Sequence, residues 1–130
     1  MIILDACVLI AFADPANLHH AAAVEILTTC EPLAVSALTG AEVMVHPPAA
    51  AETGWRQMFN DFGIKVLPLT EAEMGLLAAT RRSTRLRMPD AIVVCLAQRE
   101  GAAVASFDDR LIAKATELGL PTYPKGPPAR

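Results

Sequence analysis

Short apolar runs alternate along this chain with longer segments of helical pattern. The runs predict strands at residues 2–5, 33–36, 64–67 and 103–106, with an edge strand at 121–123. Runs that are apolar at every position are typical of strands buried on both faces of a parallel sheet. The alternation therefore predicts an α/β fold with a mostly parallel sheet of four or five strands and helices on both faces. The 130 residues suit a single domain, with 124–130 as a loose C-terminal tail.

The helices are predicted from their start and stop signals. Thr39–Glu42 and Thr70–Glu73 have capping-box spacing, Pro89 suits a first helical turn, and Gly101 and Gly119 suit helix ends. The predicted helices cover residues 7–13, 16–29, 39–46, 49–62, 70–82, 90–100 and about 108–118. Large apolar residues recur at intervals of three and four in the fourth of these, which predicts core packing; they are Trp55, Met58, Phe59 and Phe62.

Composition excludes several classes of protein. With a net charge of −3, the chain as a whole does not attract nucleic acid, so any RNA contact needs a local basic patch or bound cations. Three widely spaced cysteines without a C-x-x-C pair indicate free thiols in a reducing compartment. No apolar run approaches the roughly 20 residues of a membrane span. We expect a cytoplasmic protein without a membrane segment.

Four acidic residues fall where strands end or helices begin: Asp5, Glu42, Asp90 and Asp108, with Asp109 beside the last. Each alone is explained equally well as a helix cap or a first-turn acid. Ligand sites of open parallel sheets, however, lie beyond the carboxyl ends of the strands. Two carboxylates about 4 Å apart repel by roughly 4 kcal/mol at an effective dielectric of 20, so a converging set requires protons or a cation. Oxygen ligands favour Mg²⁺ or Mn²⁺, and such sites favour phosphodiester chemistry.

Other functions fit the sequence less well. A phosphatase with an Asp nucleophile of the haloacid-dehalogenase type needs a second Asp two residues after the first, where Cys7 stands. A receiver domain needs a phosphoacceptor after the third strand, where Leu67-Pro-Leu69 offers none. A non-catalytic module that binds RNA or a protein partner stays open as an alternative.

Four segments, in this order, carry a resemblance to a known family: Ile2–Ile10, Val35–Val43, Met88–Val94 and Val104–Asp108. The chain resembles the PIN-domain nucleases, and within them the VapC-type toxins of toxin–antitoxin pairs. The resemblance runs from Met1 to about Tyr123. It implies a PIN-like three-layer α/β/α fold and an endoribonuclease dependent on Mg²⁺ or Mn²⁺, in which activated water leaves a 3′-hydroxyl and a 5′-phosphate. It also implies a VapB-like antitoxin as partner and a homodimer. A PIN-domain nuclease that processes RNA outside a toxin pair stays open as an alternative.

By motif position, the resemblance assigns the site residues. Asp5, Glu42, Asp90 and Asp108 would be catalytic and would bind the metal, with Asp109 as an auxiliary ligand. Ser36 and Ser106 would position these ligands without binding the metal themselves. One departure concerns the two residues after Asp5. The family often has Thr-Ser or Ala-Asn there, whereas this chain has Ala6 and Cys7, so that polar contact is either lost or replaced by a thiol.

A basic cluster precedes Asp90, and it comprises Arg81, Arg82, Arg85 and Arg87. If the site lies at the start of the following helix, Arg85 and Arg87 are the predicted contacts for RNA phosphates. The alternative is an ordinary solvated helix end, where basic residues complement the helix dipole. The three histidines, His19, His20 and His46, lack ligand spacing and are expected at the surface or at helix ends.

Overall fold

All five strands of the sheet run parallel. The computed structural model describes residues 1–46 and 51–125. The strands are β1 (Ile2–Leu4), β2 (Leu33–Ser36), β3 (Lys65–Leu67), β4 (Ala103–Ala105) and β5 (Thr122–Tyr123), in the order β3-β2-β1-β4-β5. The predicted α/β class and parallel sheet are confirmed. The predicted start of a helix at 49–50 and most of the predicted tail, 126–130, lie outside the described residues.

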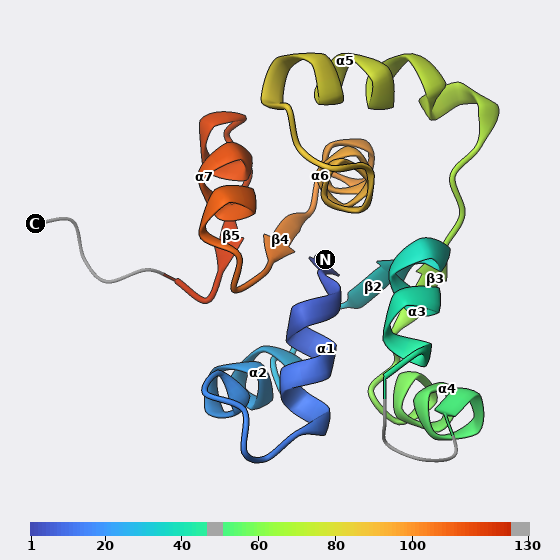
Figure 1. Ribbon diagram of the computed structural model, residues 1–130, viewed down its shortest axis with the longest axis vertical. Helices are drawn as coiled ribbons and strands as arrows, with labels where there is room; N and C mark the ends of the chain where they lie inside the picture. The colour runs from blue at the N-terminus through green and yellow to red at the C-terminus, as the bar shows by residue number, and fades with distance from the viewer. Residues whose placement is uncertain (47–50, 126–130) are drawn as a thin grey trace, which may run out of the picture.

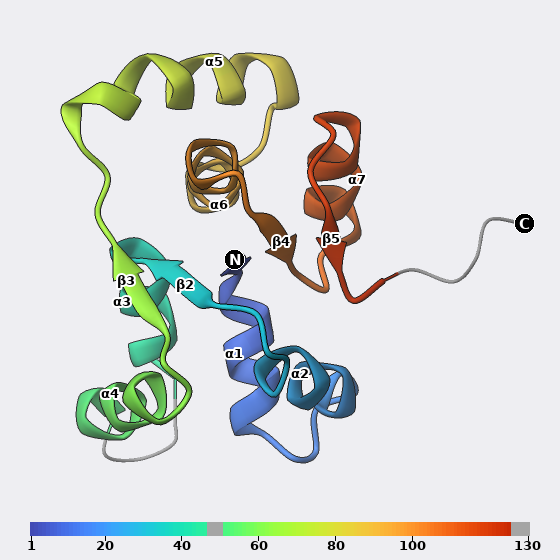
Figure 2. The same cartoon turned by 180° about the vertical axis from the view of Figure 1, so that it is seen from behind.

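Helices cover both faces of this sheet (Figures 1 and 2), which gives the predicted three layers. One face carries α1 (Ala6–Ala13), α2 (His20–Leu27), α3 (Ala37–Met44) and α4 (Ala51–Asp61). The other face carries α5 (Met74–Thr84), which follows the 3-10 turn η1 (Glu71–Glu73), together with α6 (Met88–Glu100) and α7 (Asp109–Glu117). Among these helices, none is long and apolar enough to cross a membrane.

The core consists of one apolar cluster on each face of the sheet. Ile2 and Leu4 of β1 point into the cluster formed with α1–α4, whereas Ile3 points into the cluster formed with α6 and α7. Successive side chains of a strand point to opposite faces, so a central strand covered by helices on both sides must be apolar throughout. The predicted core stripe of α4 is confirmed, because Trp55 and Phe59 are buried in the first cluster.

Helix α6 is buried over most of its circumference. Eight consecutive residues, Asp90 to Ala97, are buried, since α6 lies between the sheet and α5 (Figure 1). A helix enclosed on both sides needs no polar face, which explains the unbroken apolar run in its sequence. Pro89 lies in the first turn and Gly101 caps the end with φ +62°, as predicted. Asp90 is therefore a carboxylate placed at the buried start of an apolar helix.

The two predicted capping boxes have different outcomes. Thr70 and Glu73 form the reciprocal box at the start of η1. The prediction of a capping box at Thr39–Glu42 was wrong, because α3 begins directly after Ser36. The Ser36 Oγ caps the helix by accepting the backbone N–H of Thr39 at 2.9 Å. The strand thus passes straight into the helix, and Glu42 lies in its second turn. Its carboxylate is consequently not needed as a helix cap.

Candidate functional site

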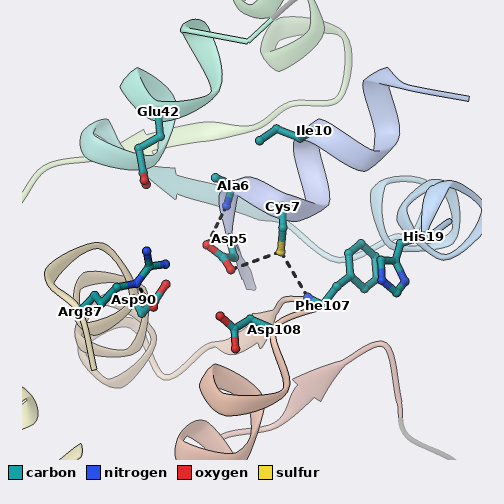
Figure 3. Close-up of a pocket in the computed structure, with 10 residues that line it drawn as sticks. All are labelled: Asp5, Ala6, Cys7, Ile10, His19, Glu42, Arg87, Asp90, Phe107 and Asp108. Atoms are coloured by element: carbon teal, nitrogen blue, oxygen red, sulfur yellow. Dashed lines mark hydrogen bonds and ion pairs between the residues drawn. The ribbon is translucent and has the colours of Figure 1, made fainter. Parts of the chain in front are cut away.

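A pocket opens at the carboxyl edge of the sheet, beside the central strand β1. The strand that follows β1 in sequence, β2, lies on one side of it, and β4 lies on the other side. Such a reversal of strand order is the usual place of ligand sites in open parallel sheets. The pocket has a volume of about 430 Å³, and all four predicted acids line it: Asp5, Glu42, Asp90 and Asp108 (Figure 3). Ala6, Cys7 and Ile10 of α1 contribute to its wall, together with Arg87, His19 and Phe107.

Asp5 is held in place through both of its carboxylate oxygens. Its Oδ1 accepts the backbone N–H of Ala6 at 2.8 Å and so caps α1. Its Oδ2 accepts the Ser106 hydroxyl at 2.7 Å and the Cys7 thiol at 3.3 Å. Since Asp5 is almost fully buried, these bonds fix the direction in which the carboxylate faces the pocket.

The thiol of Cys7 replaces the polar contact that the sequence left in doubt. Burial, followed by the nearby charge of Asp5, raises the pKa of Cys7 to about 11, so the thiol keeps its proton at neutral pH. The thiol can therefore donate to Asp5 while its sulfur accepts the backbone N–H of Phe107 at 3.3 Å. Ser106 completes the network, because its Oγ accepts the backbone N–H of Asp108 at 3.0 Å. One thiol and one hydroxyl thus tie the end of β1 to the turn after β4.

We expect Ser106→Ala to lower the affinity of the pocket for Mn²⁺ about 10- to 100-fold, the usual effect of removing a group that orients a carboxylate toward a cation. The change also leaves buried polar partners unsatisfied, which is expected to cost about 1–3 kcal/mol of unfolding free energy. Titration with Mn²⁺ and thermal unfolding measure the two effects. Ser83→Ala is the matched control, because Ser83 is exposed on α5 and its hydroxyl, among the described hydrogen bonds, donates to the Thr80 carbonyl. Unchanged Mn²⁺ affinity of Ser106→Ala would contradict a positioning role.

The pKa values of Glu42 and Asp90 show that the acids act on one another. Burial raises the pKa of Asp90, the charge of Asp5 raises it further, and the Arg87 guanidinium lowers it. Burial also raises the pKa of Glu42, and the charges of Asp5 and Asp90 add to that rise. When all four carboxylates are ionised, Arg87 is the one guanidinium or ammonium group in the described lining, and three negative charges are left uncompensated. The pocket is thus electrostatically prepared for a cation.

Of the two predicted RNA-binding arginines, one lines the pocket. Arg87 Nε lies 3.3 Å from Asp90 Oδ2, and its side chain is 75% exposed, so the ion pair is weakly held. Arg85 ends α5 in the left-handed conformation with φ +59°, and its carbonyl accepts Arg110 Nη2 at 3.0 Å. Arg85 is not among the described residues that line the pocket.

The remaining predicted residues lie beside the acids. Asp109 is exposed at the start of α7 and lines a neighbouring hollow with His19, instead of the pocket of the four acids. Asp108 is the N-cap of α7, and both of its capping bonds, to the N–H groups of Arg110 and Leu111, use Oδ1. Ser36 bonds to Thr39 and caps α3, so it supports the helix that carries Glu42 without touching an acid in the described hydrogen bonds.

Two aromatic residues of the pocket were not predicted. The rings of His19 and Phe107 stack with centroids 4.4 Å apart and an interplanar angle of 11°. Both line the pocket of the four acids. His19 was expected only at the surface or a helix end, where it does lie, and Phe107 stands between Ser106 and Asp108 without a recognisable pattern. The contact joins residues that are far apart in the sequence, so no local sequence pattern predicts it.

The donor chemistry of the pocket fits a hard divalent cation. All four acids offer carboxylate oxygens, the preferred ligands of Mg²⁺ and Mn²⁺. Within the described residues, however, no three Asp, Glu, His or Cys side chains converge closely enough to form a finished ligand set.

Comparisons with known proteins concern the family and the fold of the chain. A model of the PIN domain family matches residues 2–117. No curated protein matches the sequence. A toxin–antitoxin complex from Klebsiella pneumoniae is similar in structure, with 22% identity, a TM-score of 0.69, and coverage of 87% of this chain and 91% of that chain.

Two further solved structures share the fold. VapC20 of Mycobacterium tuberculosis, described as a toxin that cleaves the sarcin-ricin loop, has 14% identity and a TM-score of 0.71 over 87% of this chain and 94% of that chain. VapBC-1 from nontypeable Haemophilus influenzae has 18% identity and a TM-score of 0.65 over 94% of this chain and 96% of that chain. At these identities the likeness concerns the fold.

Proposed function

The chain belongs to the PIN domain family, and on this premise we propose that it is a divalent-metal-dependent endoribonuclease. PIN-domain nucleases generally use divalent metal ions. The observation that carries the proposal is the pocket lined by four carboxylates from separate parts of the chain, Asp5, Glu42, Asp90 and Asp108. A receptor for anionic RNA gains nothing from such a cluster by itself, whereas a nuclease that binds cations requires it.

We assign the metal-holding role to these four acids, with Asp109 as an auxiliary ligand beside them. Bound Mg²⁺ or Mn²⁺ supplies an activated water nucleophile and stabilises the negative charge that develops on the phosphate. The chain's own contribution is orientation. Ser106 and Cys7 direct Asp5 into the pocket, and Asp90 is held at the start of a buried helix.

Arg87 has the geometry of a phosphate-binding residue. Its guanidinium lies beside Asp90 at the margin of the pocket, and its side chain is mostly exposed (Figure 3). An arginine can exchange a weak carboxylate pair for a bidentate contact with phosphate. Arg87 would then hold the substrate backbone beside the carboxylates, and Arg85 would contact it farther along the strand.

Incubation of the purified chain with total RNA and Mn²⁺ tests the proposed activity. We expect new RNA ends that carry a 5′-phosphate, mapped by ligation-dependent sequencing, and no such ends when EDTA is present. RNA that stays intact with Mn²⁺, under conditions in which the chain is folded, would overturn the assignment as a nuclease. It would favour a PIN module that binds RNA or protein without cutting.

We expect Arg87→Gln to weaken RNA binding at every sequence tested and to reduce the slope of log K against log salt by about 1, as the loss of one phosphate contact requires. Binding of a labelled single-stranded RNA is measured by fluorescence anisotropy at several salt concentrations. Arg82→Gln is the matched control, because Arg82 lies on α5 outside the described lining of the pocket. An unchanged salt slope for Arg87→Gln, or an equal change for both variants, would exclude the phosphate contact.

The biological role that we propose is that of the toxin in a type II toxin–antitoxin pair. It is supported by the fold shared with solved toxin–antitoxin complexes from Klebsiella pneumoniae and Haemophilus influenzae. A VapB-like antitoxin as partner, a homodimer and a cytoplasmic location follow from this role and are proposed with it. Induced expression in a bacterial host should stop growth, and co-expression of a short open reading frame adjacent to the gene should restore it. Growth unaffected by induction, with cleavage intact in vitro, would favour an RNA-processing nuclease.

A further inference from the structure

We infer that the stacked rings of His19 and Phe107 form a platform for one nucleobase of the RNA substrate, next to the phosphate that is cut. The inference rests on the proposed ribonuclease function and adds to it a subsite that binds a base. The platform lies where the end of β4 meets the turn before α2, and both rings line the same pocket as the four acids.

Phe107 is the fixed member of the platform. Its backbone N–H donates to Cys7 Sγ at 3.3 Å, and its ring is partly buried against the core cluster of α1–α4. It follows Ser106 and precedes Asp108, so the platform that it supports stands beside a predicted catalytic carboxylate. A movement of Phe107 would disturb the bonds that orient Asp5, which makes it a rigid base for a stack.

His19 is the accessible member of the platform. Its ring covers Phe107, yet the residue is exposed, and its ring does not cap α2. The turn beneath it is held by the Asn17 side chain instead, since Asn17 Oδ1 accepts the backbone N–H of His19 at 2.8 Å. The neighbouring His20 differs, because its Nδ1 lies 2.9 Å from the Ala11 carbonyl and its ring packs against Phe12. His20 thus has a structural contact for its ring nitrogen, whereas the described hydrogen bonds give the His19 ring none.

The position of the stack relative to Arg87 suits a single RNA strand. Figure 3 shows Arg87 on one side of the carboxylates and the His19–Phe107 stack on the other. A strand that crosses the pocket can therefore place a phosphate on Arg87, the next phosphate over the acids and a base on the stack. Single-stranded RNA is commonly bound in this way, by charge along the backbone and by aromatic rings against bases. Stacking also tolerates any base, which suits a site whose lining has few groups that read base edges.

Nuclear magnetic resonance tests the platform directly on the full chain. The chain has three histidines, so His20 and His46 serve as internal controls for the imidazole resonances of His19. A mixed-sequence single-stranded RNA 12-mer is titrated into Asp90→Asn with Mg²⁺, a variant chosen to prevent cleavage while keeping the side chain's size. We expect the ring protons of His19 to move upfield, as the ring current of a stacked base requires, while those of His20 stay in place.

Substitutions at the same position separate stacking from charge. In the same background, His19→Ala should weaken binding of the labelled 12-mer about 5- to 160-fold, the range measured for the loss of one base–aromatic stack. His19→Phe should restore the affinity, whereas His19→Lys should not. Leu18→Ala is the matched control, because Leu18 is 91% exposed in the same turn and has no ring. Rescue by Lys and not by Phe would assign His19 to a phosphate contact and overturn the platform.

The remaining outcomes also decide the inference. RNA that leaves the His19 resonances unmoved, or that does not bind at all, overturns it, and so does an equal loss for Leu18→Ala and His19→Ala. A hexa-arginine peptide serves as a probe for binding of a basic protein segment. If the peptide shifts the His19 resonances and RNA does not, the stack binds a protein segment and the inference is overturned. Failure of the platform is distinct from failure of the proposed function, because the unsubstituted chain can cleave RNA with Mn²⁺ while His19→Ala cleaves it equally well.

Discussion

Replacing Asp5 by Asn should lower the rate of RNA cleavage by about 100- to 1000-fold, the loss typical when one group that stabilises transition-state charge is removed. Asn keeps the shape of the side chain and can still accept the backbone N–H of Ala6 that caps α1. It cannot supply the charge that the cation requires. Initial rates on a labelled RNA with Mn²⁺ measure the effect, and equal rates for Asp5→Asn and the unsubstituted chain would refute the proposed metal site.

The pH dependence of stability separates lost chemistry from a lost fold in the same variant. The charge of Asp5 raises the pKa values of both Glu42 and Asp90, so it repels their ionised forms in the absence of metal. Removing that charge should therefore reduce the fall in melting temperature of the metal-free chain between pH 5 and pH 7.5. The difference between the two pH values must be used, because the Nδ2 of Asn cannot accept from Ser106 and Cys7 as the carboxylate does. Asp14→Asn is the matched control at the other end of α1, outside the described lining of the pocket, and an equal fall for Asp5→Asn and the unsubstituted chain would contradict the coupling of the acids.

The architecture was predictable because each layer leaves its own periodicity in the sequence. Strands covered on both faces must be apolar at every position, as Ile2, Ile3 and Leu4 are, and this pattern located the central strand. The start of α6 was marked by Pro89 and its end by Gly101. The helix boundaries that these two residues predict are those of the folded chain, because no tertiary contact competes with them.

The start of α3 was predicted at the wrong residue. The spacing of Thr39 and Glu42 predicts a capping box, whereas the structure caps the helix with Ser36 because the strand passes directly into α3. That choice depends on how β2 is paired with its neighbours, which a capping pattern does not contain. The result matters for the site, because it leaves the Glu42 carboxylate available to the pocket.

The positions of four of the site's acids could be predicted, whereas the groups around them could not. Acids at the ends of parallel strands and at the start of a helix must gather near one edge of the sheet, whatever the side-chain details. The contacts of Cys7 with Asp5 and of His19 with Phe107 depend instead on how turns fold across the top of the sheet. The assigned roles of the acids stay predictions until activity is measured.

Divalent metal should stabilise the chain, and the increment should grow as the pH rises. Because the pKa values of Glu42 and Asp90 are raised, the metal-free chain binds these protons more tightly when folded than when unfolded. The stability that these two groups contribute is fully present below their ordinary pKa values. It is lost as the pH rises through their raised pKa values in the folded chain. A cation needs the same carboxylates deprotonated, so its affinity increases over the same interval.

Thermal unfolding with and without Mg²⁺ or Mn²⁺ at pH 5 and pH 7.5 measures this linkage. At a metal concentration about 100 times Kd, we expect the metal to raise the free energy of unfolding by roughly 2.7 kcal/mol at pH 7.5, which corresponds to roughly 10 °C in Tm. The increase at pH 5 should be smaller. The difference between metal and EDTA must be used, because Thr70 and Arg99 lower the pKa of Glu73, which weakens the fold in acid regardless of metal. Glu42→Gln should flatten the pH dependence of the increment. An increment that is equal at both pH values would show that the metal does not bind at Glu42 and Asp90.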